Sequence, residues 1–281
     1  LVTGSARLDT FRQSGDSLAG RFYSLRLHPV SVREWCEQTG AAPDQALTHL
    51  LARGGFPEPC LADVLQDADR WRMQYFEGLV RDDVLEFSRL HEVSAMRLFA
   101  EMLRSRVGSP LSLASIARDL QVAPATLSKY LGILEALFIV FTVRPWHRNI
   151  ARATLQAPKV YFFDTGLVLG DAGLRFENLV ACSLLKHVQW QQDTQGLAVD
   201  LHYIRTKDNA EVDFCLSQGN TLTDLIECKL SDGKPHRALT RFAGEWPQAR
   251  PTQLVRDLRN EQDIGPIEVR RAAEWLNALE A

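Results

Sequence analysis

The sequence predicts an all-α region followed by an α/β domain with a mixed sheet. Two observations carry this prediction. Apolar residues recur at helical spacing from Ser31 to Leu137, which is typical of packed amphipathic helices. In the second half, short segments that alternate apolar and polar residues indicate half-buried strands, with helical segments among them. A chain of 281 residues is long enough for two or more domains, each with its own core.

Composition narrows the class of protein. Apolar residues make up 46% of the chain and charged residues 24%, which is ordinary for a soluble globular protein. The net charge of −3 excludes a uniformly basic surface, so any nucleic-acid binding requires a local patch. No apolar run approaches the roughly 20 residues that cross a bilayer, and no signal peptide is visible. The five cysteines are scattered without C-x-x-C spacing, which favours reduced thiols in a cytoplasmic protein over a zinc site.

Caps and apolar faces define the first helices. Ser31 and Glu34 have the spacing of a capping box, in which each side chain accepts a hydrogen bond from the other residue's backbone. A second helix ends at Gly54. Two longer helices are predicted, one over residues 68–87 and one that starts at Ser94. Their apolar faces indicate core packing, so we interpret these helices as scaffold.

Residues 109–156 have the pattern of a winged helix-turn-helix. Ser112 caps a short helix, a second helix is predicted over 125–137, and a strand follows over 138–143. The second helix of such a unit can enter the major groove of DNA. Three basic residues on this helix and the wing are the predicted phosphate contacts: Lys129, Arg144 and Arg148. A winged helix that only packs against neighbouring domains is an equal alternative.

The strongest pattern is a pair of alternating segments, 209–216 and 224–230. Residues 217–220 between them have turn composition, so the two segments predict an antiparallel hairpin. Strict alternation places Val212 and Phe214 together on the apolar face. Pairing brings three polar side chains together on the other surface: Asp213, Glu227 and Lys229.

These three side chains suit metal-assisted chemistry on phosphate esters. Two adjacent carboxylates hold Mg²⁺ well, because Mg²⁺ prefers oxygen ligands and keeps several waters. Such an ion polarises a phosphodiester and lowers the pKa of its bound water. A nearby ammonium can orient the attacking water or stabilise the phosphate. The alternative is a solvated strand face with a Glu–Lys pair. Cys215 and Cys228 are left out of the site because thiolates suit Mg²⁺ poorly.

Asp213 followed by Glu227-Cys-Lys229 resembles the D…E-x-K core of the restriction-endonuclease-like nucleases. Residues 175–180 resemble the helix that supplies that core's additional acidic residue, here Glu177. The resemblance implies that Glu177, Asp213 and Glu227 hold Mg²⁺ and that Lys229 positions the hydrolytic water. For Glu177, a structural hydrogen bond is the equal alternative, since a carboxylate near the core needs a partner.

Five motifs together are similar to one family, the C-terminal domain of unknown function carried by a group of prokaryotic AAA-type ATPases. They are Asp164-Thr-Gly166, Phe176-Glu-Asn178, Tyr203-x-Arg205-Thr206, Ala210-Glu-Val-Asp213 and Ile226-Glu-Cys-Lys229. The first 34 residues also resemble that group, but no G-x-x-x-x-G-K-[ST] occurs in the chain. We therefore expect the C-terminal part of a longer ATPase, without ATPase activity of its own. In the full-length protein, Arg7 and Arg21 would contact the phosphates of ATP; alternatively, they are surface arginines.

This resemblance implies four segments. Residues 1–30 would be a remnant of the nucleotide domain, 31–108 the helical region, 109–156 the winged helix-turn-helix and 157–281 a restriction-endonuclease-like α/β domain. The expected function is nucleic-acid binding, with Mg²⁺-dependent phosphodiester cleavage. The alternative is a non-catalytic adaptor coupled to the missing ATPase half. Expected partners are DNA and that upstream half, and the sequence leaves the oligomeric state open.

Overall fold

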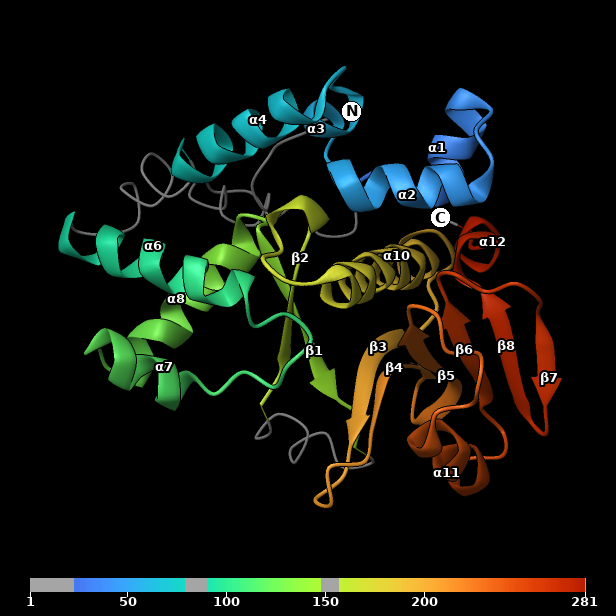
Figure 1. The fold of residues 1–281 in the computed structure, drawn as a ribbon. Coiled ribbons are helices and arrows are strands. Elements are labelled where there is room, and N and C mark those ends of the chain that lie inside the picture. The colour runs from blue at the N-terminus through green and yellow to red at the C-terminus, as the bar shows by residue number, and fades with distance from the viewer. Residues whose placement is uncertain (1–22, 79–89, 148–156, 281) are drawn as a thin grey trace.

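The computed structural model describes residues 23–78, 90–147 and 157–280, and it contains a helical region followed by a mixed eight-stranded sheet (Figure 1). This confirms the predicted mixture of all-α and α/β structure. The strand order is β2-β1-β3-β4-β5-β6-β8-β7. The pairs β1–β3, β5–β6 and β6–β8 are parallel, and the other neighbours are antiparallel. Arg7, Arg21 and Arg148 lie outside the described residues.

The elements follow one another in two groups. The first group of described helices is α1 (Val32–Thr39), α2 (Pro43–Arg53), α3 (Pro57–Leu61), α4 (Leu65–Gly78), α6 (Leu90–Arg104), α7 (Leu113–Leu120) and α8 (Pro124–Ala136). The second group is β1 (Val140–Pro145), β2 (Lys159–Phe162), the 3₁₀ turn η3 (Thr165–Leu167), α10 (Ala172–Gln195), β3 (Val199–Arg205), β4 (Glu211–Gln218), β5 (Thr221–Lys229), α11 (Arg237–Glu245), β6 (Arg250–Val255), β7 (Gln262–Ile264), β8 (Ile267–Arg271) and α12 (Ala272–Asn277).

The helix caps agree in part with the sequence. Ser31 and Glu34 form the predicted capping box at the start of α1. Ser112 caps α7 by accepting a hydrogen bond from the backbone of Ser115. Helix α6 begins at Leu90, so Ser94 lies inside the helix and the predicted start was wrong. Among the described residues, no helix is both long and apolar enough to span a membrane.

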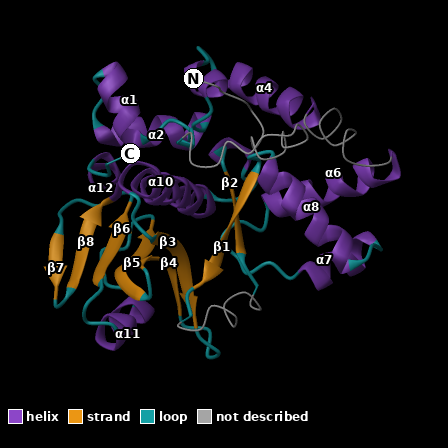
Figure 2. Ribbon diagram, turned by 180° about the vertical axis from the view of Figure 1, so that it is seen from behind, coloured by secondary structure: helices purple, strands orange, loops and turns teal. Residues whose placement is uncertain are grey.

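Helices cover both faces of the sheet (Figures 1 and 2). The long helix α10 packs on one face, with α2 and α12 beside it, and Phe176 and Phe214 are buried in that core. Helix α11 packs on the other face, where Leu225 and Phe242 belong to a second, smaller core.

A bulge in β4 departs from the expected alternation. In the β3–β4 ladder His202 pairs with Cys215 and Ile204 with Val212, so two residues of β4 oppose Tyr203 alone. A bulge of this kind shifts the strand's facing by one residue. Val212 accordingly packs in the α11-side core and Phe214 in the α10-side core, which corrects the prediction that they share a face. Asp213 is one of the two bulged residues.

Strands β1 and β2 connect the helical region to the sheet. They pair antiparallel over Val140–Val143, and β1 then runs parallel to β3 at Arg144 and Pro145. The strand expected at 138–143 is thus displaced, because Phe138 has a left-handed backbone (φ 55°) and ends the preceding turn. The sheet is continuous across residue 157, where the last domain was expected to begin.

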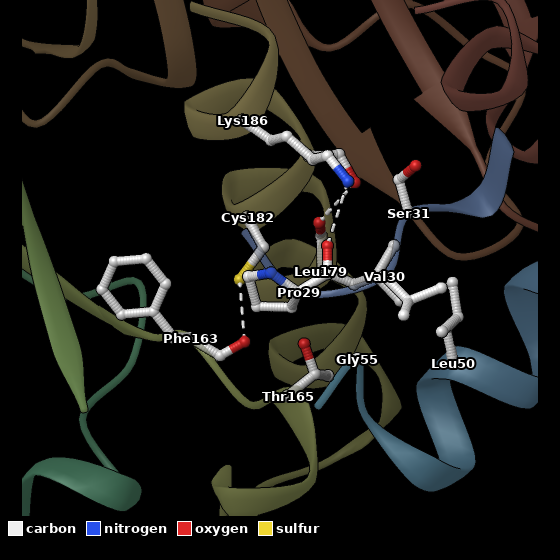
Figure 3. Close-up of a pocket in the computed structure, with 11 residues that line it drawn as sticks. Pro29, Val30, Ser31, Leu50, Gly55, Phe163, Thr165, Leu179, Cys182 and Lys186 are labelled. Carbon is white, nitrogen blue, oxygen red and sulfur yellow. Dashed lines mark hydrogen bonds between the residues drawn. The ribbon is translucent and has the colours of Figure 1, made fainter. Parts of the chain in front are cut away.

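The segment before α1 lies across α10 (Figure 3). The Lys186 ammonium donates to the carbonyl of Pro29 at 3.2 Å, and the backbone N–H of Val30 donates to Gly55 at 2.8 Å. A small pocket remains beneath this crossing, lined among others by Thr165 and Cys182. These contacts hold the beginning of the described chain against α10 and against the loop after α2.

Candidate functional site

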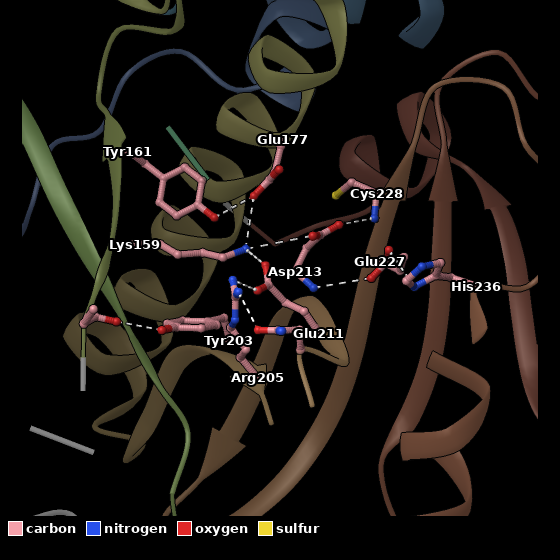
Figure 4. Close-up of polar contacts among 12 residues, drawn as sticks. Lys159, Tyr161, Glu177, Tyr203, Arg205, Glu211, Asp213, Glu227, Cys228 and His236 are labelled. Atoms are coloured by element: carbon pink, nitrogen blue, oxygen red, sulfur yellow. Dashed lines mark hydrogen bonds and ion pairs between the residues drawn. The ribbon is translucent and has the colours of Figure 1, made fainter. Parts of the chain in front are cut away.

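The candidate site gathers side chains from α10, β2, β4 and β5 and from the residue before α11 (Figure 4). Strands β4 and β5 form the predicted hairpin, with Phe214 opposite Ile226 in the antiparallel ladder. Asp213 and Glu227 therefore lie on neighbouring strands, as expected. Helix α10 precedes the three-stranded meander β3–β4–β5 and presents Glu177 to it.

Each of the two strand carboxylates accepts a backbone N–H from the facing strand of the hairpin. The N–H of Cys228 donates to Asp213 Oδ2 at 2.8 Å, and the N–H of Asp213 lies 3.4 Å from Glu227 Oε2. The paired residues of the β4–β5 ladder end at Phe214 and Ile226, so these two N–H groups lie beyond the ladder and donate to side chains. The carboxylates are consequently fixed in place by the sheet itself.

Glu227 has two cationic or polar neighbours. The Lys229 ammonium donates to Glu227 Oε1 at 2.5 Å, and His236 Nδ1 lies 3.0 Å from the same oxygen. Burial opposes the charged form of Glu227, but the contacts with His236 and Lys229 outweigh it and hold its pKa below the ordinary value. The Glu227 side chain is only 3% exposed, whereas Lys229 is 31% exposed and can reach a ligand.

Buried Gln253 positions His236. Its side-chain oxygen accepts the backbone N–H of His236 at 2.8 Å. Its amide nitrogen donates to the carbonyls of Asp232 and Lys234 at 2.9 and 2.8 Å. The loop between β5 and α11 is thus tied to β6, and this places the imidazole beside Glu227.

Lys159 lies at the centre of the acidic cluster. Its ammonium is 2.6 Å from Glu211 Oε1, 3.5 Å from Glu177 Oε1 and 4.0 Å from Asp213 Oδ1. The side chain is 1% exposed and the ammonium also sits 5.2 Å from the ring centre of Tyr203. Burial works against its charge, but the three carboxylates outweigh burial and raise the pKa of Lys159. The contacts are ion pairs, since the ammonium has no hydrogen bond of good geometry.

Glu177 faces the cluster, where its partners are Tyr161 and Lys159. The Tyr161 hydroxyl donates to Glu177 Oε1 at 2.8 Å. The carboxylate also packs against Gly108, in the loop after α6, where an added Cβ would lie 2.6 Å from Oε1. Burial raises the pKa of Glu177 in spite of the opposing influence of Lys159 and Tyr161.

The cluster carries more negative than positive charge. Four carboxylates (Glu177, Glu211, Asp213, Glu227) meet two ammonium groups (Lys159, Lys229), and Arg205 adds an ion pair to Glu211 at 2.9 Å. Burial, with repulsion by Glu227 and Glu177, raises the pKa of Asp213 well above its ordinary range. Asp213 therefore lacks a full counter-charge.

Asp213 and Glu227 are the oxygen donors that a divalent cation could use. Their chemistry fits Mg²⁺, and the unbalanced charge at Asp213 favours a cation. In the described part of the chain, no three His, Cys, Asp or Glu side chains are arranged to hold a metal ion. Glu177 reaches Asp213 only through Lys159. A metal held jointly by all three predicted carboxylates stays a prediction.

Sequence reasoning missed several members of the site: Lys159, Tyr161, Glu211 and His236. A signal for Lys159 exists, because a lysine opens an otherwise apolar strand, Lys-Val-Tyr-Phe. Of the predicted phosphate contacts, Lys129 is exposed on α8 and Arg144 is exposed on β1. Neither belongs to the acidic cluster.

Four of the five motifs singled out in the sequence contribute residues to this site, and the fifth, Asp164-Thr-Gly166, is joined to them through Thr165. Asn178 brackets β2 by accepting from the N–H of Phe162 at 2.8 Å and donating to its carbonyl at 2.9 Å. Its amide also donates to the Thr165 hydroxyl at 3.0 Å. The Tyr203 hydroxyl donates to the carbonyl of Ala157 at 2.6 Å. These contacts hold β2, and with it Lys159, against α10 and β3.

Comparison with known families finds matches over residues 44–272. Residues 44–177 match a family described as "Domain of unknown function (DUF8612)", and residues 172–272 match "Domain of unknown function (DUF4143)". Over these ranges the chain is similar to two domains of unknown function. The candidate site draws on both, because Lys159 lies in the first match, Asp213 and Glu227 lie in the second, and Glu177 lies where the two overlap.

Similar proteins are longer than this chain. An uncharacterized protein of Mycobacterium tuberculosis is 30% identical over 219 residues, covering 76% of the chain and 48% of the relative. An uncharacterized protein of Mycobacterium bovis matches equally. One of Haemophilus influenzae is 22% identical over 231 residues, 76% of the chain and 55% of the relative. The chain thus spans about half the length of the curated relatives it matches. No solved structure matches it significantly.

Proposed function

We propose that this chain is a nucleic-acid-binding module with a metal-dependent phosphodiesterase site of the restriction-endonuclease-like type. The observation that carries the proposal is that Asp213 and Glu227 each accept a backbone N–H from the facing strand, while Lys229 donates to the second carboxylate. The order of elements also supports it, since α10, the meander β3–β4–β5, α11 and parallel β6 form one continuous unit.

The chemistry assigned to each residue follows from its surroundings. Asp213 and Glu227 would hold Mg²⁺, which when bound polarises a phosphodiester and lowers the pKa of a bound water. Lys229, partly exposed beside Glu227, orients the water or contacts the phosphate. His236, on the other side of Glu227, is placed to move a proton at the exposed edge of the site.

A winged helix-turn-helix is proposed for α7, α8 and the β1–β2 pair. The two helices pack on each other, and β1 follows α8 directly. Exposed Lys129 and Arg144 then contact the phosphates of duplex DNA, and Arg148 extends the same set. Strand β2 belongs both to the proposed wing and, through Lys159, to the acidic cluster. The wing would therefore bind DNA through an element that also contributes to the cluster.

We further propose that the chain acts as the C-terminal portion of a longer AAA-type ATPase. Its relatives are about twice as long, which leaves room for a nucleotide domain. Arg7 and Arg21 would contact the phosphates of ATP in that full-length protein. In this chain, which lacks a P-loop motif, no ATP hydrolysis is expected.

The second candidate function is a non-catalytic docking module. Lys159 favours it, because a buried ammonium already neutralises part of the acidic cluster without a metal. A cluster that is partly neutralised by its own lysine can preserve the fold after loss of catalysis. The docking surface would then serve the ATPase half or DNA.

Incubation with end-labelled single-stranded and duplex DNA and RNA, with Mg²⁺ or Mn²⁺ and with EDTA, separates the two candidates. The nuclease proposal expects metal-dependent cleavage of at least one substrate that disappears in Asp213→Asn. If neither this chain nor the full-length protein cleaves any substrate with either ion, the nuclease proposal is wrong and the docking module is favoured.

A further inference from the structure

A fully buried ammonium among carboxylates needs a physical reason. Taking Lys159 out of water costs several kcal/mol, and only close negative charge offsets such a cost. Three carboxylates lie within 4.0 Å of the ammonium, and no other buried lysine occurs in the described ranges. The arrangement is that of a cation enclosed by oxygen donors, which is also the arrangement that a metal ion requires.

We propose that Lys159 is the built-in cation of this cluster. It occupies the position between Glu177, Glu211 and Asp213 that a divalent cation would otherwise take, and it confines metal binding to the Asp213–Glu227 side. Glu177 is then a partner of Lys159 and not a metal ligand. The inference rests on the proposed function only in that the remaining ligand is a divalent cation.

The position of Lys159 is fixed by the sheet on both sides. Its backbone pairs with Val143 in the β1–β2 ladder, and Pro110 forms an isolated bridge to it on the other edge. The ring of Tyr203 lies against the ammonium at 5.2 Å. Since the side chain is buried from backbone to tip, a metal cannot displace it by a simple rotation into solvent.

Electrostatic repulsion prevents the Lys159 ammonium and a divalent cation from occupying this position together. Like charges a few ångströms apart repel by several kcal/mol in a protein of effective dielectric constant about 20, and the divalent charge doubles that term. Glu177 and Glu211 can therefore bind the ammonium or a metal ion, but not both. Asp213 is the weakest partner of Lys159, at 4.0 Å, and remains open to a cation on its Glu227 side.

Replacement of the lysine tests the proposal. Lys159→Met keeps a long apolar stem and removes the charge. We expect this variant to bind Mn²⁺ about tenfold or more tightly than the wild type by calorimetry, or to bind one ion more per chain. Its thermal midpoint should fall in EDTA and rise again with Mn²⁺, because the metal then supplies the missing positive charge. These readouts need no catalytic turnover.

The matched control is Lys186→Met. Lys186 is also ion-paired and mostly buried, but it contacts the single carboxylate of Glu34. Its loss should leave Mn²⁺ affinity and stoichiometry unchanged, and Mn²⁺ should not restore its stability. A similar metal response in both variants would show a general effect of lost charge and would overturn the proposal.

A double variant covers the case in which Lys159→Met does not fold. Lys159→Met/Glu177→Gln lowers the repulsion left behind, so it should be more stable in EDTA than the single variant and should lose the added Mn²⁺ affinity. If the double variant is as unstable as the single one, Lys159 is a packing residue and the proposal is wrong.

The outcome is separable from that of the proposed nuclease. A wild type that binds Mn²⁺ but cleaves nothing, with a Lys159→Met variant that binds Mn²⁺ more tightly, contradicts the nuclease and supports the built-in cation. A wild type that cleaves, with a Lys159→Met variant that binds Mn²⁺ like the wild type, supports the nuclease and contradicts the built-in cation.

Discussion

Arg72 and Asp164 form a buried ion pair, with Nε 2.9 Å from Oδ2, that joins α4 to the turn after β2. Asp164 also accepts the backbone N–H of Gly166 at 3.1 Å. A Cβ on Gly166 would collide with the Arg72 guanidinium, and one on Gly54 with the Asp164 carboxylate. The Asp164-Thr-Gly166 motif therefore connects the helical region to the sheet.

Arg72→Met should destabilise the protein by about 3–5 kcal/mol, because it leaves the Asp164 carboxylate buried without its partner. Urea unfolding followed by circular dichroism measures this loss. Asp69→Asn is the control: Asp69 also pairs with Arg72, at 2.9 Å, but its side chain is 67% exposed, so a change below about 1 kcal/mol is expected. Equal losses for the two variants would contradict a special role of the buried pair.

Gly108 should tolerate no side chain, for two reasons. Its φ is 73°, which disfavours any Cβ, and the Cβ would approach Glu177 Oε1 to 2.6 Å. Gly108→Ala should therefore destabilise the protein by more than Gly219→Ala, where φ is 58° and nothing lies within 4 Å. The difference in unfolding free energy between the two variants isolates the contact with Glu177.

The carboxylate contact predicts a rescue. Glu177→Ala removes the atoms that the new methyl group would meet, so Gly108→Ala should cost about 1 kcal/mol in that background, the cost of the backbone conformation alone. If Gly108→Ala costs as much unfolding free energy in the Glu177→Ala background as in the wild type, the contact with Glu177 does not contribute to its effect.

The hairpin was predictable because alternation with period two is strong in both of its segments, and two polar faces had to meet once the strands paired. Periodicity could not reveal the bulge, since one extra residue in β4 appears only when β3 is laid beside it. It is this bulge that places Val212 and Phe214 on opposite faces of the sheet.

The rest of the site depends on contacts between distant segments. Glu177 was expected on its helix, but its partners, Tyr161 and Lys159, come from another element, β2. Arg72 lies in a helix whose pattern gives no hint of a buried ion pair with Asp164. His236 precedes α11 and is placed by Gln253 of β6. The local periodicity of the sequence does not reveal such contacts between different elements.

His28 makes stability depend on pH. Burial, with smaller effects of Lys186 and Arg26, lowers the pKa of His28 from 6.5 to about 4, although its Nε2 lies 2.8 Å from Gln189 Oε1. The unfolded chain takes up a proton below about pH 6.5 and the folded chain does not, so stability falls as pH decreases from about 6.5 to about 4.

His28→Gln should remove that dependence while it keeps a polar group near Gln189. The difference in unfolding free energy between variant and wild type should change by about 1–2 kcal/mol between pH 7 and pH 5, in the direction of a flatter curve for the variant. Thermal unfolding at several pH values gives the comparison. Parallel curves would place the pH response elsewhere.

The proposed wing should bind DNA in a salt-dependent way. If Lys129, Arg144 and Arg148 contact phosphates, the affinity for duplex DNA falls with salt by a slope of about 0.9 per contact, and the triple alanine variant flattens that slope. Arg250→Ala is the control, since its guanidinium is exposed on β6 and pairs with Asp224. Salt-independent binding, or none at low salt, favours a winged helix that only packs.

Asp213 and Lys229 should fail in different ways if the site is catalytic. Asp213→Asn removes charge with little change of shape, so it should weaken Mn²⁺ binding and abolish cleavage. Lys229→Ala should leave Mn²⁺ affinity within a few-fold of the wild type and lose cleavage by about 10²-fold or more, because its ammonium acts on water or phosphate. Calorimetry and single-turnover cleavage at saturating metal measure the two effects separately.

Both variants should stay folded, because Lys229 is partly exposed and Asp213 lies at a bulge, outside both apolar cores. Asp213→Asn should be neutral or slightly stabilising without metal, since burial, together with repulsion by Glu227 and Glu177, already raises the pKa of this carboxylate. That expectation sets catalysis apart from structure: a residue kept for stability would destabilise the protein when replaced. If Asp213→Asn unfolds more easily in EDTA and Mn²⁺ binds it like the wild type, Asp213 is a structural residue and the nuclease proposal fails.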